Sequence, residues 1–251
     1  MASPQATASF RFYAELNDHL PPRLRYRQLE KRFLLPASVK DMIESLGVPH
    51  PEVDLVLVNG ESTDFTRLIQ SGDRVSVYPV FESIDITPAL RLRPQPLRVP
   101  KFVLDVHLGK LAGYLRMLGF DTVYSNDAGD SELVKISVEQ SRTLLTRDRG
   151  LLKHSAVTRG HWMRETDSRR QTEEVLKRFD LARNLHPFTR CIVCNGLLDA
   201  ISKSYVAGRV PEKVLRWSDE FRECSRCRRV YWEGSHYRRM KRWIEQLAAA
   251  S

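Results

Sequence analysis

The pattern of apolar and polar residues at the start of the chain predicts a strand followed by a helix. Residues 9–16 (SFRFYAEL) alternate between the two classes, as a half-buried strand does. Ser38 with Asp41 three positions later resembles a capping box, and Gly47 is the kind of residue that ends a helix. We therefore expect a helix between residue 38 and residue 47.

A second group of strands is expected after this helix. Residues 53–58 are mostly apolar, the Asn59-Gly60 pair predicts a tight hairpin turn, and residues 74–81 predict the last strand. Strands on both sides of one helix within about eighty residues suggest a β-grasp fold. We expect this domain to cover residues 1–88.

Prolines then separate this domain from the next. Four of them, at positions 88, 94, 96 and 100, prevent a continuous helix or strand, so residues 89–100 are predicted to form a semi-rigid linker.

Short apolar strands alternate with helical patterns beyond the linker. This alternation predicts a parallel sheet with helices on both faces, an α/β domain over residues 101–183. The strands are expected at 102–104, 122–124, 143–146 and 161–163, and the helices at 108–118, 131–141 and 171–179.

Composition narrows the class of protein and of partner. The chain has 251 residues, 42% of them apolar. It shows neither a membrane-length apolar run nor a secretory signal, so we expect a soluble, cytoplasmic protein. The net charge is +9, and residues 181–251 hold 14 Lys and Arg against 7 Asp and Glu, a net of +7. This excess favours a polyanionic partner; the alternative is a solvated basic surface.

All four cysteines fall into two CxxC pairs, Cys191/Cys194 and Cys224/Cys227, with 29 residues between the pairs. Two such pairs offer four thiolates, the ligand set of a structural zinc site. Disulfides or unrelated free thiols are the alternative reading. Four protein ligands leave no open position, so this zinc would stabilise residues 184–251 and take no part in catalysis.

Carboxylates follow the predicted strands and open the helices of the α/β domain. Asp105 and Asp148 come directly after apolar strands, while Asp130 and Glu132 start a helix and Asp167 follows the fourth strand. Ligands bind beyond the carboxyl ends of parallel strands, so these acids are expected at one edge. Several carboxylates at one edge need a cation, and hard oxygen ligands suit Mg²⁺ or Mn²⁺.

These acids have ordinary structural readings too. Asp130 and Asp167 are suited to helix starts, and Glu132 is favoured by the helix dipole. Asp105 and Asp148 are harder to explain without a partner. Basic side chains nearby could guide a phosphate backbone, namely Lys110, Arg116, Arg147, Arg149 and Arg164.

Aromatic and basic residues are interleaved beyond the last cysteine. Tyr231, Trp232, His236, Tyr237 and Trp243 are mixed with Arg238, Arg239, Lys241 and Arg242. Such a mixture suits unpaired bases and phosphates, which favours RNA. The alternative is that Tyr231 and Trp232 pack the zinc module while Met240, Trp243 and Leu247 form the buried stripe of a helix.

Two resemblances to known families add to this reading. VLVNGESTDF and SGDRVSVYPVFE resemble the ubiquitin-like sulfur carriers of thiamine and molybdopterin biosynthesis. Those carriers act through a free C-terminal Gly-Gly, whereas this chain continues through Phe81-Glu82, so an interaction or scaffolding role is expected instead.

The second resemblance covers nearly the whole chain. FVLDVHLGKLAGYLRMLGFDT, NDAGDSELV, LLTRDRGLLK, FTRCIVCNG and YWEGSHYRRM, in this order, resemble the Mut-seven C-terminal ribonuclease family. The resemblance implies an N-terminal ubiquitin-like domain, a PIN-like nuclease domain and a C-terminal zinc ribbon. It implies metal-binding acids at Asp105, Asp130 with Glu132, and Asp148, with Asp167 as a weaker fourth. Val106 stands where many PIN-like proteins have another acid, which leaves one-metal catalysis open.

The sequence therefore predicts a ribonuclease that depends on Mg²⁺ or Mn²⁺ and acts on structured RNA such as tRNA or ribosomal RNA. The alternative is a non-catalytic RNA- or ribosome-binding factor. In either case the β-grasp domain is expected to recruit a protein partner that the sequence does not identify.

Overall fold

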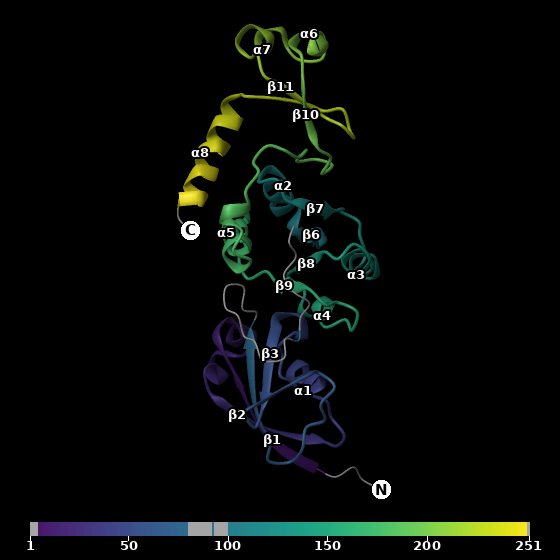
Figure 1. The fold of residues 1–251 in the computed structure, drawn as a ribbon, viewed down its shortest axis with the longest axis vertical. Coiled ribbons are helices and arrows are strands. Elements are labelled where there is room, and N and C mark those ends of the chain that lie inside the picture. The colour runs from purple at the N-terminus through teal and green to yellow at the C-terminus, as the bar shows by residue number, and fades with distance from the viewer. Residues whose placement is uncertain (1–4, 80–91, 93–99, 250–251) are drawn as a thin grey trace. The chain divides into compact units, whose positions relative to one another are not determined.

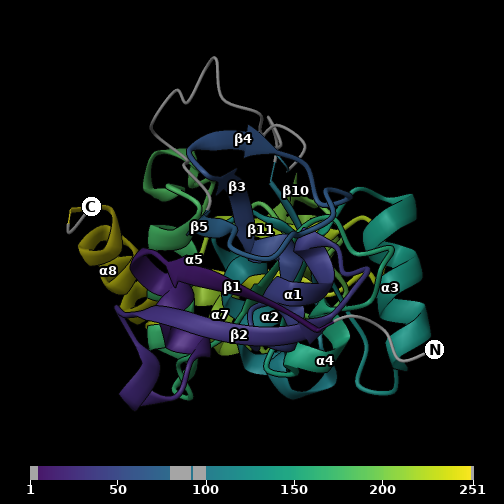
Figure 2. The same ribbon diagram turned by 90° about the horizontal axis from the view of Figure 1, so that it is seen from below.

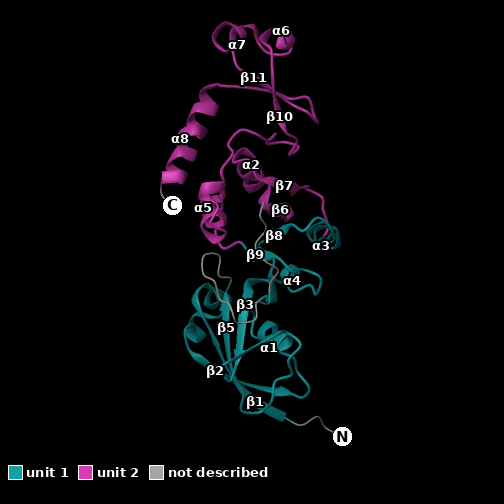
Figure 3. Cartoon of the chain, viewed as in Figure 1, with its two compact units in different colours: residues 1–98, 130–162 teal, residues 99–129, 163–251 magenta. Residues whose placement is uncertain are grey.

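The computed structural model describes residues 5–79, 92 and 100–249, and the chain separates into two compact units (Figure 3). The first unit combines residues 1–98 with 130–162, and the second combines 99–129 with 163–251. Most of the expected linker, with the prolines at 88, 94 and 96, lies outside the described residues. The last two positions of the strand expected at 74–81 also lie outside them.

The N-terminal part of the first unit is a five-stranded sheet in the order β2-β1-β5-β3-β4 (Figures 1 and 2). Strand β1 is parallel to β5, and the other neighbouring strands are antiparallel. This is the predicted β-grasp fold. Its elements are β1 (Gln5–Phe12), η1 (Ala14–His19), η2 (Pro22–Leu24), β2 (Gln28–Leu34), α1 (Val39–Ser45), η3 (His50–Glu52), β3 (Val53–Val58), β4 (Glu61–Thr63) and β5 (Arg74–Pro79).

Local sequence signals explain most of these boundaries. The Ser38 hydroxyl accepts a hydrogen bond from the Asp41 backbone N–H at 3.1 Å, so the predicted capping box is confirmed. Asn59 and Gly60 have φ values of 54° and 93°, the left-handed pair that a tight hairpin turn requires. The strand predicted at 9–16 is wrong at its end, because the Asn17 amide donates to the Phe12 carbonyl at 2.9 Å and closes a 3-10 turn.

The rest of the first unit is α/β. Strands β8 and β9 form a parallel pair in which Leu145 is opposite His161. The four residues of β8 are buried, as expected for a strand of a parallel sheet. The elements are α3 (Asp130–Glu139), β8 (Thr143–Thr146), α4 (Arg149–Leu152) and β9 (Gly160–Trp162); the short helix α4 was not predicted.

Hydrogen bonds join the β-grasp part of this unit to its α/β part through Glu52. The Glu52 side chain is 0% exposed, and one of its carboxylate oxygens accepts from the Trp162 backbone N–H at 2.7 Å. The other oxygen lies 3.0 Å from His19 Nε2. The neighbouring residue His50 has its Nε2 2.9 Å from the Val157 carbonyl. A buried carboxylate with these partners fixes β9 against the β-grasp part.

We expect Glu52→Ala to lower the free energy of unfolding by about 3–5 kcal/mol, because it leaves buried polar groups without their acceptor. Urea unfolding followed by circular dichroism measures this change. Glu61→Ala, at an exposed position of strand β4, is the matched control and should change stability by less than about 0.5 kcal/mol. Equal stabilities of the two variants would show that the Glu52 contacts contribute nothing.

The second unit contains another parallel pair of strands, β6 and β7, in which Phe102 is opposite Thr122. The Phe102 ring packs against Phe120 and Phe179, each with ring centroids 5.9 Å apart. Gly119 ends helix α2 with φ of 100°, and a Cβ there would collide with the His186 carbonyl. The elements are β6 (Lys101–Leu104), η4 (Val106–Leu108), α2 (Gly109–Met117), β7 (Asp121–Tyr124), α5 (Ser168–Arg178) and η5 (Ala182–Asn184).

The C-terminal part of this unit is a three-stranded antiparallel sheet in the order β10-β11-β12, followed by a long helix. Two short helices lie between β10 and β11 in the sequence (Figure 1). The elements are β10 (Leu198–Ile201), α6 (Lys203–Val206), α7 (Glu212–Trp217), β11 (Phe221–Cys224), β12 (Val230–Trp232) and α8 (Ser235–Ala249). Among the described residues, no helix has the length and apolar character needed to cross a membrane.

Candidate functional site

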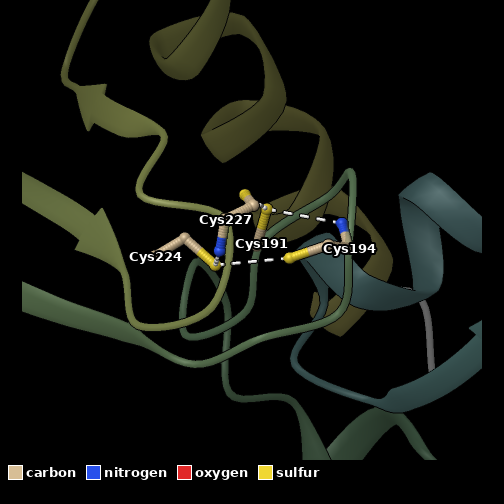
Figure 4. A group of neighbouring side chains, drawn as sticks. All are labelled: Cys191, Cys194, Cys224 and Cys227. Carbon is tan, nitrogen blue, oxygen red and sulfur yellow. Dashed lines mark hydrogen bonds between the residues drawn. The ribbon is translucent and has the colours of Figure 1, made fainter.

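The two CxxC pairs come together at the ends of the three-stranded sheet, and their four side chains converge (Figure 4). The four sulfur atoms lie within 4.8 Å of one another, with Cys191–Cys227 at 3.6 Å and Cys194–Cys224 at 3.4 Å. A zinc tetrahedron with bonds of roughly 2.3 Å has sulfur–sulfur edges of about 3.8 Å. All four cysteines are free thiols rather than disulfides. Their geometry therefore fits a structural zinc ion.

The surroundings of the four thiols favour ionisation of Cys191 before that of Cys227. Burial raises the pKa of Cys191, but hydrogen bonds from the Tyr231 hydroxyl and from backbone N–H groups outweigh it and lower this pKa to about 6. At Cys227, burial of the sulfur and the neighbouring thiols raise the pKa to about 12. Four sulfurs this close cannot all ionise alone. A divalent cation would take up the four negative charges, so its binding releases protons.

The loop between Cys191 and Cys194 docks on the parallel strands of the same unit. The Arg116 guanidinium donates to the carbonyls of Ile192 and Val193 at 3.1 and 2.8 Å. The Asn195 side chain accepts from the Thr122 backbone N–H at 3.0 Å and donates to the Asp121 carboxylate at 2.7 Å. These bonds attach the cysteine site to α2 and β7.

These bonds correct one expectation about phosphate guidance. Arg116 is buried and donates to backbone carbonyls, so its side chain does not face RNA. The same burial lowers its pKa. Arg164 is also engaged, with its guanidinium 3.7 Å from the Glu174 carboxylate. No periodicity in the sequence distinguishes such an arginine from an exposed one.

Asp105 directly follows β6, where the sequence places it. Its carboxylate is 6% exposed and accepts the His107 backbone N–H at 3.3 Å. A carboxylate buried at the end of an apolar strand is costly unless a cation or several hydrogen-bond donors compensate it. Asp105 caps η4 through the bond from the His107 N–H, and it is the most buried of the candidate acids.

The other candidate acids are all exposed and lie at helix starts. Asp148 follows β8 and caps α4, with its carboxylate accepting the Gly150 N–H at 2.6 Å. Asp130 and Glu132 lie in the first turn of α3. Asp167 caps α5 and accepts from the N–H groups of Arg169 and Arg170. Asp130, Glu132 and Asp167 therefore lie at helix starts, as their structural alternatives predicted, whereas the capping role of Asp148 is not predicted by the sequence.

The structure brings the four cysteines together, whereas the candidate acids are divided between the two units. Within the described residues, the four cysteines form a group of metal-ligating side chains whose ligand atoms all lie within 4.8 Å of one another. Asp105 and Asp167 belong to the second unit, whereas Asp130, Glu132 and Asp148 belong to the first. The convergence of these carboxylates on a metal ion stays a prediction.

The basic candidates of the α/β region differ in what they contact. Lys110 and Arg147 are exposed. Arg149 donates to the His19 carbonyl at 3.0 Å, and its guanidinium lies 4.9 Å from the Trp162 ring centroid. Arg149 therefore holds α4 to the β-grasp part, although the side chain remains exposed.

Helix α8 presents its basic residues to solvent and its apolar residues to the protein. The exposed side chains include His236, Arg238, Arg239, Lys241 and Arg242. Trp243 is buried with Met240 and Leu247, and its ring lies 5.0 Å from that of Tyr114. The buried-stripe alternative is thus confirmed for Trp243, which cannot stack on RNA. Tyr237 is half-buried and remains a candidate.

Comparison with known proteins agrees with this architecture. The family model described as the Mut7-C RNAse domain matches residues 100–244, and the model described as Mut7-C ubiquitin matches residues 5–85. No curated protein gives a match.

Among solved structures, the chain is similar to the crystal structure of H. volcanii small archaeal modifier protein 1. The identity is 19%, over 30% of this chain and 99% of that chain, with a TM-score of 0.25. The RNAse-domain match, by contrast, covers more than half of the chain. The chain belongs to the Mut7-C RNAse family.

Proposed function

We propose that the protein is a ribonuclease that hydrolyses RNA phosphodiester bonds with the help of Mg²⁺ or Mn²⁺. The observation that carries this proposal is the match of the RNAse-domain model to residues 100–244. The net charge of +9 supports a polyanionic substrate. We assign residues 1–88 to the ubiquitin-like domain, 101–183 to the nuclease domain and 184–251 to the zinc ribbon.

The acids after the strands are the proposed ligands of the catalytic ion. Asp105 and Asp148, with Asp130 or Glu132, supply the hard oxygen donors that Mg²⁺ and Mn²⁺ prefer. The places of Asp105 after β6 and of Asp148 after β8 support this assignment, since ligands bind beyond the carboxyl ends of parallel strands. Such an ion, when bound, activates water and stabilises the negative charge that develops on the phosphate. Asp167, which caps α5, is the weakest candidate of the set.

Exposed cations are the proposed contacts to the RNA backbone. Lys110 and Arg147 would contact phosphates near the acids, and the basic side chains of α8 would contact a more distant part of the strand. Zinc holds the ribbon that carries α8, and takes no part in the reaction. Structured RNA, such as tRNA or ribosomal RNA, is the proposed substrate class.

We expect purified protein that retains its zinc to cleave RNA only after Mn²⁺ or Mg²⁺ is added. Cleavage of labelled tRNA is followed on denaturing gels, first in metal-free buffer and then with each ion. Zinc content is measured in the same samples, so that loss of the structural ion is not mistaken for loss of the catalytic one. Equal cleavage without added metal contradicts the metal requirement. Salt-sensitive binding of tRNA and ribosomal RNA without any turnover favours the alternative, a non-catalytic RNA-binding factor.

A further inference from the structure

A cavity of about 470 Å³ lies in the second unit, between the three-stranded sheet β10-β11-β12 and the start of α8. Its volume falls in the range of small-ligand sites in proteins. Apolar side chains from separate segments form much of its lining, among them Met117 at the end of α2 and Met240 on α8. Neither the cysteine site nor the proposed catalytic acids line this cavity.

Aromatic rings form its walls. Phe188 precedes the first cysteine pair, Trp232 lies on β12, and Tyr237 lies on α8. The rings of Phe188 and Tyr237 pack together with centroids 4.2 Å apart and planes at 35°. Tyr231, which also lines the cavity, has its hydroxyl 3.0 Å from Cys191 Sγ. One wall of the cavity is therefore tied to the cysteine site through Tyr231.

Two glutamates and two arginines, Arg190 and Arg222, supply the charged part of the lining. The glutamates are Glu220 and Glu233, and the Tyr237 hydroxyl donates to the Glu233 carboxylate. Burial, and then this bond, raise the pKa of Tyr237 to about 12, so the hydroxyl stays protonated and remains a donor. The two glutamates balance the charges of the two arginines, so the lining has no excess of positive charge that would select a phosphate group. Carboxylates accept hydrogen bonds from the amino groups of nucleobases, as Glu does with the N4 amino group of cytosine.

Positive charge continues along the helix that closes the cavity. Arg238, Arg239, Lys241 and Arg242 are exposed on α8, immediately after the lining residue Tyr237. A nucleic acid strand needs aromatic faces for its bases and cations for its phosphates. Here the aromatic faces lie in the cavity and the cations lie just outside it.

We propose that this cavity binds an unpaired, amino-bearing nucleobase of an RNA strand whose backbone follows α8. The proposal rests on the proposed function, since it names the part of the RNA that the ribbon recognises. Stacking on the aromatic walls supplies affinity, and the two carboxylates favour cytosine over uracil.

Binding of labelled oligocytidylate to the zinc-loaded protein, without added Mg²⁺ or Mn²⁺, tests this proposal. Replacement of Tyr237 or Phe188 by Leu keeps apolar bulk but removes a ring, and should weaken binding about tenfold. Tyr205→Leu, on exposed helix α6 and outside the cavity, is the matched control and should bind as wild type does. Zinc content and thermal midpoint confirm that each variant is folded.

Glu233→Gln tests the choice of base. Wild-type protein should bind oligocytidylate several times more tightly than oligouridylate, and the variant should lose most of this difference. Unchanged affinity of the ring variants overturns the proposal and leaves an apolar peptide as the better occupant. If the ring variants lose as much affinity for double-stranded RNA, the proposal is overturned as well, because paired bases cannot enter the cavity. Because no catalytic ion is present, these outcomes do not depend on whether the protein cleaves RNA.

Discussion

Asp148→Asn should reduce RNA cleavage by at least about a hundredfold while RNA affinity stays the same or rises. The proposed catalytic ion would lose a charged oxygen ligand, and removal of such a ligand acts mainly on the reaction step. The fold should tolerate the change, because Asn caps helices about as well as Asp and can still accept the Gly150 N–H. Cleavage rates at saturating Mn²⁺, measured beside RNA affinity, check both expectations.

Asp64→Asn is the matched control for this variant. Asp64 is another exposed carboxylate, and it accepts the N–H groups of Thr66 and Arg67 in a turn of the β-grasp domain. The same change of charge there should leave cleavage unaltered. If Asp148→Asn protein cleaves RNA as fast as the control, Asp148 is not a ligand of the catalytic ion. In that case its role is confined to capping α4.

Cys191→Ser should release the zinc and unfold the ribbon. Structural zinc contributes roughly 10–16 kcal/mol of apparent binding free energy at neutral pH, far more than such a small sheet gains by packing. Wild-type protein should contain one zinc ion per chain, and the variant should contain much less. Metal analysis, with hydrogen exchange over residues 198–232, measures the loss of metal and the loss of structure together.

Arg226→Ser provides the control within the same cysteine pair. Arg226 is exposed and lies between Cys224 and Cys227 without contributing a sulfur. The Arg226→Ser variant should keep its zinc, and the backbone amides of its strands should still exchange hydrogen slowly. Since ionisation of the thiols accompanies metal uptake, zinc affinity should also fall as the pH is lowered through the neutral range, and more steeply below about 6, where the Cys191 thiol is protonated as well. A ribbon that stays ordered in Cys191→Ser would show that zinc does not hold it together.

Local signals in the sequence account for much of the fold. The capping box of Ser38 and Asp41 and the Asn59-Gly60 turn depend only on neighbouring residues, so the elements around them could be predicted. The four cysteines likewise identify one another by spacing. The end of β1 could not be predicted in this way. It depends on Asn17, a polar residue that turns back to the Phe12 carbonyl.

The site was predictable only in part, because burial depends on contacts that are distant in sequence. Arg116 looks like any exposed helix arginine until it meets the carbonyls of Ile192 and Val193, more than seventy residues later. Trp243 was equally ambiguous between an RNA contact and a core residue, and packing against Tyr114 decided the matter. The positions of Asp105 and Asp148 after their strands were predicted correctly. That these two acids bind a common metal ion stays a prediction.

The Glu52 contact has a consequence for the production of the two family-matched regions as separate fragments. The two family matches end and begin on either side of residues 86–99, yet the bond from Trp162 N–H to Glu52 joins one matched region to the other. A nuclease fragment made without the ubiquitin-like fragment would leave this N–H without Glu52, and the Val157 carbonyl without His50. The two fragments, produced as separate polypeptides, should bind each other, and each should be less stable without the other.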